Sequence, residues 1–335
     1  MRYAPKFVLL AVVLGLTTLA SAEPPRPQPR FDSNILADTF QVTTAADADV
    51  PLEQIHQGCP ARDCIPAIDD PQFLPAAKAD RLAADDLVIG IAIAGAVRAY
   101  PTFILDHHEI VNDTVAGTPV AITWCPLCGS GLAFERVLDG KPVQFGVSGL
   151  LHESDLVMYD RASNSLWQQV SATAIAGPRR GQKLARFPVT MTTWGEWLGA
   201  HPDTQVLSTA TGHDGDYSNK TPYADYVRSD RILFPVQRNS QLSSPKTVVY
   251  GVQLPTGAVA VTEALLRDQG QLDIEHQGQS LHWQRDAAGA VDVRAASGEH
   301  YPALRMYWFA WFTFHPDTIL QKTVPAPVAT DPTAH

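Results

Sequence analysis

The sequence predicts an α+β protein, rich in β structure, with two degenerate ββαββ repeats joined by additional β-hairpins. Repeat one covers residues 87–124 and repeat two covers residues 248–283; each shows two apolar strands, a short helix and two further strands in that order. A constant offset of 161 residues pairs turn glycines of the two segments, for example Gly117 with Gly278. Between the repeats, turn signals such as the Asp-Gly pair at 139–140 predict hairpins.

The first 22 residues have the pattern of a secretory signal peptide. Arg2 and Lys6 precede an apolar run, and Ala20-Ser21-Ala22 fits a cleavage site made of small residues. The apolar run is too short for a permanent membrane span. We therefore expect an exported protein, periplasmic or extracellular, that has no stable membrane anchor after cleavage of residues 1–22.

Composition divides the rest of the chain into three parts. Residues 23–51 are rich in proline and alanine and predict a flexible lead-in, and residues 322–335 predict a loose tail for the same reason. Residues 52–321 are left for a single folded domain, which we expect to have two lobes.

The charge balance limits the classes of partner. The formal net charge is −10, and the charges are scattered along the chain, which is typical of a solvated surface. A nucleic-acid partner would require a basic face, so we expect none. The sequence has no glycine-rich phosphate loop, dinucleotide-binding fingerprint, nucleophile elbow or zinc-protease helix. We expect the partner to be a metal ion or a small-molecule ligand.

The stretch Cys125-Pro126-Leu127-Cys128-Gly129 is the strongest indication of chemistry in the chain. Proline and glycine favour a tight turn that brings two thiols together. We expect backbone N–H groups of this turn to point at the sulfurs and to stabilise thiolates. Repeat two has no cysteine at the corresponding place, so the sequence predicts the site in repeat one.

Two thiols at this spacing have several chemical uses. They supply half of a tetrahedral zinc site or a two-coordinate copper(I) site, they form a redox-active dithiol, or they close a structural bridge. The four cysteines of the chain allow three disulfide pairings. Further zinc ligands are available elsewhere in the chain, and one alternative is a structural site with four cysteines. These further ligands are Cys59, Cys64, His107, His108 and His152.

His108 is the histidine that we expect to complete the metal site. It follows the helix of repeat one and precedes a strand whose expected partner ends at Cys125. The alternative is that its imidazole binds a buried carbonyl group. In the strand that begins at Asp155, alternation places Asp155 and Tyr159 on one face, where they can act as acid, base or hydrogen-bonding groups. Turn capping and solvation of a sheet edge explain these two residues equally well.

Seven tryptophans give the chain a large aromatic content, with a dense run at residues 307–314. We expect these rings to fill the core between the lobes. The alternative is a surface of exposed tryptophans that binds a ligand.

Many segments, in order, resemble the domain-of-unknown-function 3179 family over roughly residues 52–319. The family's name leaves its activity open, so the resemblance implies kinship and no reaction. The segments that carry it are Ile65-Pro-Ala-Ile-Asp-Asp-Pro71, His108-Glu-Ile-Val-Asn-Asp113, Thr123-Trp-Cys-Pro-Leu-Cys-Gly129, Phe145-Gly-Val-Ser-Gly149, Asp155-Leu-Val-Met-Tyr-Asp160, Leu166-Trp-Gln168, Thr193-Trp-Gly-Glu-Trp197, Trp308-Phe-Ala-Trp311 and His315-Pro-Asp-Thr318.

The resemblance implies more about the cysteines than their spacing does. Cys125 and Cys128 belong to the family pattern, whereas glycines are common in the family where this chain has Cys59 and Cys64. The resemblance therefore implies a local disulfide between Cys59 and Cys64. The predicted repeat also looks similar to the fold shared by a copper accessory protein of nitrous-oxide reductase and organomercurial lyase, which handle soft metals with sulfur ligands.

Together these observations favour an exported protein that binds copper(I) or zinc through Cys125, Cys128 and His108. Asp155 and Tyr159 are expected to line the pocket, and the role is metal handling or metal-assisted catalysis. The first alternative is a thiol–disulfide oxidoreductase in which Cys125 attacks. The second is a non-catalytic binding module with a tryptophan-rich surface.

Overall fold

The computed structural model describes residues 1, 33–218 and 220–324. Strands are the main regular structure of this part of the chain, and they are arranged in five sheets of three to five strands and one two-stranded ribbon. The predicted β-rich class is therefore confirmed. The predicted signal peptide at residues 1–22 lies outside the described residues apart from Met1, as do the beginning of the lead-in and most of the tail.

Two antiparallel sheets carry the residues on which the site depends. We name them the β6 sheet and the β10 sheet. The β6 sheet has the order β14 (Arg186–Phe187), β7 (Ser130–Glu135), β6 (Thr118–Cys125) and β5 (Ile110–Val115). The β10 sheet has the order β1 (Ile55–Gln57), β10 (Phe145–His152), β11 (Asp155–Asp160), β12 (Leu166–Gln168) and β13 (Thr173–Ala176).

Three further sheets and a ribbon complete the β structure. The β3 sheet has the order β15 (Thr190–Thr193), β3 (Leu87–Ile93), β4 (Ala96–Pro101), β16 (Gln205–Leu207) and β2 (Phe73–Pro75). The β17 sheet has the order β22 (Leu304–Tyr307), β17 (Val248–Leu254), β18 (Gly257–Thr262) and β23 (Thr318–Gln321). The β20 sheet contains β19 (Gln271–His276), β20 (Gln279–Arg285) and β21 (Val291–Ala295), and the ribbon contains β8 (Val137–Leu138) and β9 (Lys141–Pro142).

The helices are short, and each of them buries at least one side chain. α3 begins after Thr193, whose hydroxyl accepts a hydrogen bond from the Glu196 N–H as an N-cap. The α-helices are α1 (Ile35–Asp38), α2 (Thr102–Leu105), α3 (Trp194–Ala200), α4 (Ala224–Val227), α5 (Glu263–Gln269) and α6 (Trp308–Phe314), with 3-10 turns at Ala45–Asp47, Leu52–Gln54 and Ala76–Lys78.

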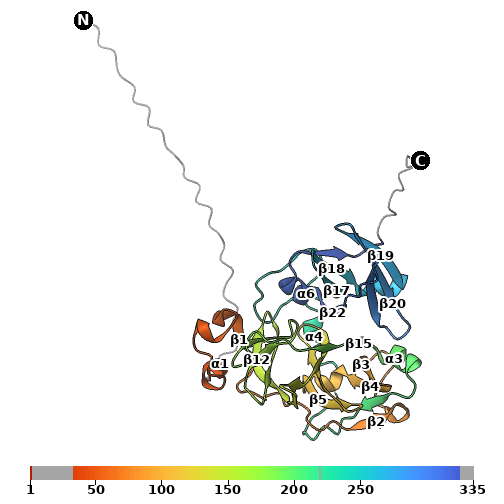
Figure 1. The fold of residues 1–335 in the computed structure, drawn as a ribbon, viewed down its shortest axis with the longest axis horizontal. Helices are drawn as coiled ribbons and strands as arrows, with labels where there is room; N and C mark the ends of the chain where they lie inside the picture. The colour runs from red at the N-terminus through yellow and green to blue at the C-terminus, as the bar shows by residue number, and fades with distance from the viewer. Residues whose placement is uncertain (2–32, 219, 325–335) are drawn as a thin grey trace.

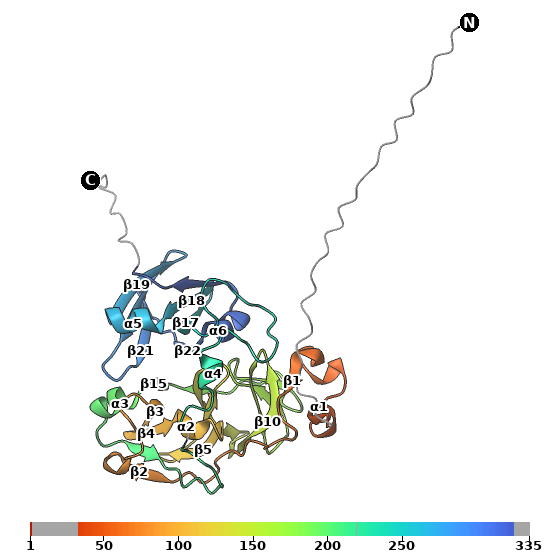
Figure 2. The same ribbon diagram turned by 180° about the vertical axis from the view of Figure 1, so that it is seen from behind.

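Elements from the C-terminal third of the chain gather on one side of the molecule. In both ribbon views the β17 and β20 sheets, with α5 and α6, lie above the sheets formed by earlier residues, and α4 lies between the two groups (Figures 1 and 2). One buried cluster spans this boundary, since it includes Cys125 and Phe145 from the earlier part and Val249 and Trp308 from the later part. The two thiols therefore lie in a core to which both parts contribute.

The folded part of the chain begins earlier than the sequence analysis expected. Residues 23–51 were predicted to be a flexible lead-in, yet from residue 33 onward the chain packs against the β10 sheet. Ile35, Phe40 and Val42 are buried in one cluster with Leu150 of β10 and with residues of β11, β12 and β13. The high proline and alanine content of the segment led to the prediction of flexibility. Burial of these three apolar side chains instead stabilises the segment by about 1.5–3 kcal/mol per large side chain.

The predicted repeat stays a prediction. In chain order the elements of repeat one are β3, β4, α2, β5 and β6, and those of repeat two are β17, β18, α5, β19 and β20. These elements are divided between two sheets in each case, β3–β4 from β5–β6 and β17–β18 from β19–β20.

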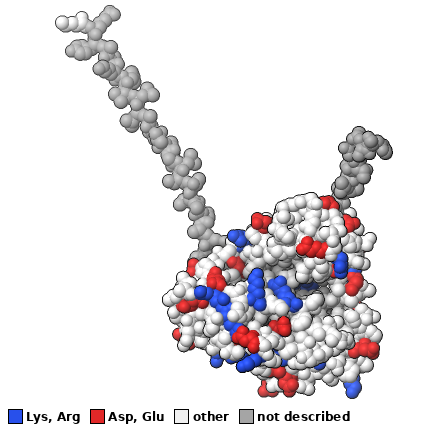
Figure 3. Space-filling view, in the orientation of Figure 1, with Lys and Arg blue, Asp and Glu red and all other residues white. Residues whose placement is uncertain are grey.

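All seven tryptophans are buried, so the alternative of a tryptophan-rich binding surface is wrong. Trp167, Trp197, Trp283, Trp308 and Trp311 are among the largest fully buried side chains, and the other two are 5% exposed. On the face drawn in Figure 3, acidic and basic side chains are interspersed, with a group of basic side chains near the middle. Within the described part of the chain, no helix has the length and apolar character needed to cross a membrane.

Candidate metal centre

The two thiols lie in a tight turn between β6 and β7. Cys125 is the last residue of β6, and the Cys128 N–H donates a hydrogen bond of 3.2 Å to the Cys125 carbonyl oxygen. Gly129 has φ of +63°, and a Cβ atom there would lie 2.8 Å from the ring of Tyr307. Both the left-handed backbone and the close ring require glycine at this position.

Aromatic residues from later in the chain hold this turn. The Tyr307 N–H donates to the Cys128 carbonyl oxygen over 2.8 Å, and the Tyr226 hydroxyl donates to the Leu127 carbonyl oxygen over 2.9 Å. Buried backbone carbonyl groups need such partners. The conformation of the turn therefore depends on α4 and β22 as well as on its own proline and glycine.

Asp155 is brought to the thiols by a two-residue hairpin turn. β10 ends at His152, β11 begins at Asp155, and these two residues are paired across the hairpin. Glu153 and Ser154 between them have φ of 55° and 59°. A type I′ turn requires positive φ at both central residues, and glycine or asparagine is usual there. A non-glycine residue in this conformation costs on the order of 1–3 kcal/mol, and such strain is often found at functional sites.

Contacts on both sides of the strained turn hold it in place. The Glu153 carboxylate accepts hydrogen bonds from the Gln237 N–H, over 2.8 Å, and from the Thr313 hydroxyl in α6. The Cys128 thiol donates to the Ser154 carbonyl oxygen over 3.3 Å. The turn that presents Asp155 is thus tied to the turn that presents the thiols.

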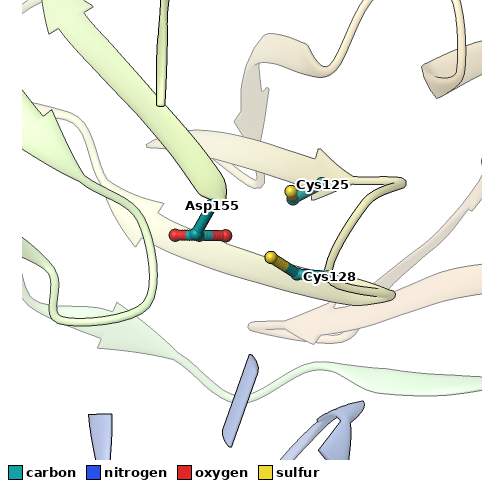
Figure 4. Close-up of side chains that lie close together, drawn as sticks. All are labelled: Cys125, Cys128 and Asp155. Atoms are coloured by element: carbon teal, nitrogen blue, oxygen red, sulfur yellow. The ribbon is translucent and has the colours of Figure 1, made fainter. Parts of the chain in front are cut away.

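Cys125, Cys128 and Asp155 form a cluster with the spacing of metal ligands. One ligand atom from each lies within 4.8 Å of the other two, and all three residues are buried. Figure 4 shows the two sulfurs and the carboxylate directed toward the same space, with Asp155 entering from the start of β11. No other group of three or more cysteine, histidine, aspartate or glutamate residues meets this spacing in the described parts of the chain.

Only one oxygen of the Asp155 carboxylate is occupied by the protein. Oδ2 accepts hydrogen bonds from the Gln168 side-chain amide, over 2.6 Å, and from the Val170 N–H, over 3.1 Å. Oδ1 is buried and has no hydrogen-bond partner among the described residues. An unpartnered buried carboxylate oxygen is costly, and a bound cation would remove that cost.

Burial dominates the electrostatics of the cluster. It raises the pKa of Asp155 to about 6 against the lowering effects of the Val170 N–H and of the two neighbouring thiols. It also raises the pKa of both thiols, and the charge of Asp155 acts in the same direction. The expectation of stabilised thiolates is therefore corrected: the Cys128 N–H does lower the pKa of Cys125, but burial outweighs it.

Glu109 is a further acidic group at the site that the sequence analysis passed over. Burial, together with the charges of Asp155 and Asp106, raises its pKa to about 8. Its backbone has φ of 56°, and its carbonyl oxygen accepts a hydrogen bond of 2.7 Å from Trp124, the residue before Cys125. Glu109 follows Asp106, His107 and His108 in a run of polar residues, so the sequence offered no signal that distinguished it. Two thiols and two carboxyl groups thus share one buried region, which favours a bound cation.

His108 does not join the thiols, so the prediction that it is the third ligand is corrected. Its Nδ1 lies 2.7 Å from the Pro66 carbonyl oxygen, and its Nε2 is hydrogen-bonded to the Tyr217 hydroxyl. Both ring nitrogens are therefore occupied in a region separate from the thiols, where the His108 ring also contacts the exposed His213. β5 and β6 pair as predicted, with Ile110 opposite Thr123. His108 precedes β5, and its ring turns toward Pro66 and Tyr217 and away from the thiols.

Tyr159 is also separated from the thiols. Its hydroxyl donates a hydrogen bond to Asp63, and its ring packs edge-on against Phe40 at 5.4 Å. It belongs to the cluster formed with the N-terminal segment, whereas Leu156 and Met158 of the same strand belong to the cluster with the cysteines. Strict alternation would place Asp155 on the same face as Tyr159. It points to the thiols instead, because it is the first residue after the left-handed turn.

The remaining cysteines and histidines have other positions. Cys59 and Cys64 form a disulfide with a Cα–Cα distance of 6.3 Å, as the resemblance implied, so they are not ligands in a four-cysteine site. His107 packs edge-on against Tyr217. His152 precedes the turn of Asp155 and packs against Phe314, outside the metal-ligand cluster.

A cavity of about 200 Å³ lies against Cys125 and Glu109. β10 and β11 supply one wall through side chains such as Leu150 and Leu156, and the segment around α4 supplies another through Phe234. The sequence offered no signal for this second wall, because its residues lie in a region without regular strands.

Comparison with known protein families identifies the family to which this chain belongs. A family model described as a protein of unknown function (DUF3179) matches residues 62–301. The chain belongs to the DUF3179 family. The DUF3179 match includes Cys125, Cys128 and Asp155, and also Glu109, whereas Cys59 precedes it. Neither the curated proteins nor the solved structures that were compared contain a match to this chain.

Proposed function

We propose that this protein binds a metal ion through the two Cys thiolates and the Asp155 carboxylate. One observation carries the proposal: three ligand atoms converge within 4.8 Å in a buried site, and one of them, Asp155 Oδ1, has no partner among the described residues. A metal would replace the missing hydrogen bond and would displace the thiol protons. Membership of the DUF3179 family leaves the activity open.

The donor set favours zinc over copper(I). Zinc accepts thiolate sulfur and carboxylate oxygen in one tetrahedral site, whereas copper(I) prefers soft ligands alone. Three protein ligands leave a fourth position for water or substrate, which is typical of catalytic rather than structural zinc. We therefore infer metal-assisted chemistry in preference to storage, with the metal acting as a Lewis acid and Glu109 beside it as an acid or base.

A thiol–disulfide oxidoreductase is the weaker alternative. Its attacking cysteine must be a thiolate, and reactive cysteines lie in electropositive, partly exposed surroundings. Cys125 and Cys128 are 2% and 0% exposed, and burial together with neighbouring acidic groups raises the pKa of both. These properties oppose thiolate attack and do not oppose metal binding, because a metal supplies the positive charge.

We also propose that the protein is exported. The supporting observations are the pattern of residues 1–22 and the Cys59–Cys64 disulfide, since disulfides persist in oxidising compartments.

We infer that the two predicted repeats are copies of one unit and that the unit is longer than the sequence analysis proposed. Gly90 in β3 lies under the ring of Trp197, and Gly251 in β17 lies under the ring of Trp311. Each ring is followed four residues later by a stacked histidine, in the motifs Trp194-Gly-Glu-Trp197-Leu-Gly-Ala-His201-Pro-Asp-Thr204 and Trp308-Phe-Ala-Trp311-Phe-Thr-Phe-His315-Pro-Asp-Thr318. Each indole N–H donates to the threonine that ends its motif. The copy with cysteines carries the site, and the other acts as scaffold.

Native mass spectrometry of the protein, purified from its exported compartment without chelators or reductants, tests the metal proposal. We expect one bound metal in the wild type and none in Cys125→Ser. The Cys59→Ser/Cys64→Ser double variant is the matched control, because it removes two cysteines outside the cluster and should keep its metal. Wild-type metal content in Cys125→Ser would contradict the proposal, as would a metal-free wild type whose mass is short by the hydrogens of two disulfides.

A further inference from the structure

The cavity beside the metal centre has the size for a small molecule. Its volume is about 200 Å³, and it touches both Cys125 and Glu109. Sites for drug-sized ligands have volumes of about 300–1,000 Å³, whereas an apolar cavity of about 150 Å³ is large enough for benzene. The occupant that fits is therefore a single ring or a short chain with one substituent.

The walls of the cavity are mostly apolar. Val147, Leu150 and Leu151 of β10 line it, and Leu233 and Phe234 close it from the segment that follows α4. Such a lining favours a hydrocarbon body, because burial of apolar surface contributes about 25 cal/mol per Å². Leu233 is 38% exposed, which places it at the opening.

Polar side chains are few, and they lie near one another. Apart from Cys59 of the disulfide, the lining residues whose side chains carry a polar group are Glu109, Cys125 and Tyr223. Glu109 and Cys125 lie at the same end, because the Glu109 carbonyl oxygen accepts a hydrogen bond of 2.7 Å from the N–H of Trp124, the residue before Cys125. None of the described residues that line the cavity is a lysine, arginine or histidine.

The lining excludes charged ligands. An anion would meet the acidic groups of the site without a basic partner, and it would lose its hydration in an apolar space. An ammonium group would lose its hydration as well in this mostly apolar space. A neutral molecule avoids both costs.

We propose that this cavity binds a small neutral molecule with an apolar body and a single polar head group, and that the head group lies at the Glu109–Cys125 end. The body lies between the leucines of β10 and Phe234. The head group forms a hydrogen bond with Glu109, which makes Glu109 the residue that orients the ligand. The inference rests on the proposed function only in that the head group then lies beside the open position of the metal.

The test uses four probes that share one ring: benzyl alcohol, toluene, benzoate and benzylammonium. Each is titrated into the full exported chain, with and without zinc, while the backbone amide signals of Val147, Leu150 and Leu151 are followed by NMR. We expect benzyl alcohol to shift these signals saturably and to bind at least about tenfold more tightly than benzoate or benzylammonium. Glu109→Ala should weaken benzyl alcohol binding and leave toluene binding within about twofold of the wild type.

Two exposed leucines provide a matched pair of variants. Leu233→Asp places a charge at the opening and should weaken benzyl alcohol binding at least about tenfold. Leu242→Asp alters a 55% exposed leucine that does not line the cavity, and it should bind the probe like the wild type. Equal binding in the two variants, no saturable shift with benzyl alcohol, or equal binding of a charged probe would overturn the inference.

The outcome separates this inference from the metal proposal. Zinc content is measured on the same samples, and Leu233→Asp should keep its zinc because Leu233 is 38% exposed whereas the three proposed ligands are buried. If no zinc binds but benzyl alcohol still fills the cavity of the wild type, the metal proposal fails and the ligand class stands. If zinc binds and benzyl alcohol does not, the ligand class is wrong and the metal proposal stands.

Discussion

The Cys128 thiol donates a hydrogen bond of 3.3 Å to the carbonyl oxygen of the residue directly before Asp155. This contact joins the turn after β6 to the turn before β11, which belong to different sheets. Sulfur and carboxylate are therefore placed against each other by the backbone, before any ligand arrives. Pre-organised ligands lower the cost of binding a metal.

Removal of the carboxylate should abolish metal binding. Asp155→Asn keeps the size of the side chain and loses the charge, so we expect the zinc affinity to fall at least about 100-fold, measured by competition with a chromogenic chelator. Asp160→Asn is the control, because Asp160 is buried in the same strand and both of its oxygens are occupied by hydrogen bonds from Ser163 and Trp167. Unchanged zinc affinity in Asp155→Asn would exclude this residue as a ligand.

Glu196 in α3 should make stability depend on pH in the acid range. Burial acts to raise its pKa, but hydrogen bonds from Thr192 and Arg285 outweigh burial and lower the pKa to about 2 from 4.5. The folded state therefore prefers the carboxylate. Its contribution is present above pH 4.5 and is lost as the pH falls through about 2.

We expect Glu196→Gln to unfold in urea with about 1–2 kcal/mol less stability than the wild type at pH 7, and the difference to vanish near pH 2. Glu275→Gln, which alters an exposed glutamate in β19, should change stability by less than about 0.5 kcal/mol. A difference between Glu196→Gln and the wild type that is the same at pH 7 and pH 2 would show that the ion pairs with Arg285 and Arg267 contribute nothing.

The close approach of Gly251 to Trp311 should tolerate no side chain. A Cβ atom at residue 251 would lie 2.4 Å from the indole ring, so Gly251→Ala should lower the unfolding free energy by about 1–3 kcal/mol or more. Gly199→Ala in α3 meets no atom within 4 Å and should be neutral or stabilising by up to about 1 kcal/mol. Thermal unfolding followed by circular dichroism distinguishes them, and equal midpoints would show that the ring moves aside at little cost.

Buried tryptophans predict weak quenching. All seven indoles are buried, so acrylamide should quench the fluorescence of the folded protein several-fold less than that of the protein in urea. Strong quenching in the folded state would restore the alternative of a tryptophan-rich binding surface.

Local patterns predicted much of the fold. The Asp-Gly pair at 139–140 does form a turn with positive φ between β8 and β9, and Thr193 does cap α3. Alternation predicted β5 and β6 and the pairing between them. Such features depend on residues close in the sequence, where turn chemistry and side-chain period act directly.

The third member of the cysteine–aspartate cluster could not be chosen from local pattern. His108 was preferred because it precedes a strand whose expected partner ends at Cys125, but its ring nitrogens are occupied by Pro66 and Tyr217. Asp155 is distant in sequence and reaches the thiols through a turn whose positive φ at Glu153 and Ser154 no propensity favours. Tertiary contacts decided both cases.

The hydrogen bond between Glu153 and Thr313 spans 160 residues of sequence. Because α6 is among the last elements of the chain, the hairpin that presents Asp155 has its support only after nearly the whole polypeptide is available. The turn that carries the two thiols likewise needs Tyr307, whose N–H binds the Cys128 carbonyl oxygen. We therefore expect metal acquisition to follow folding rather than to nucleate it, so that an incompletely synthesised or unfolded chain offers two cysteines but no centre that can retain an ion.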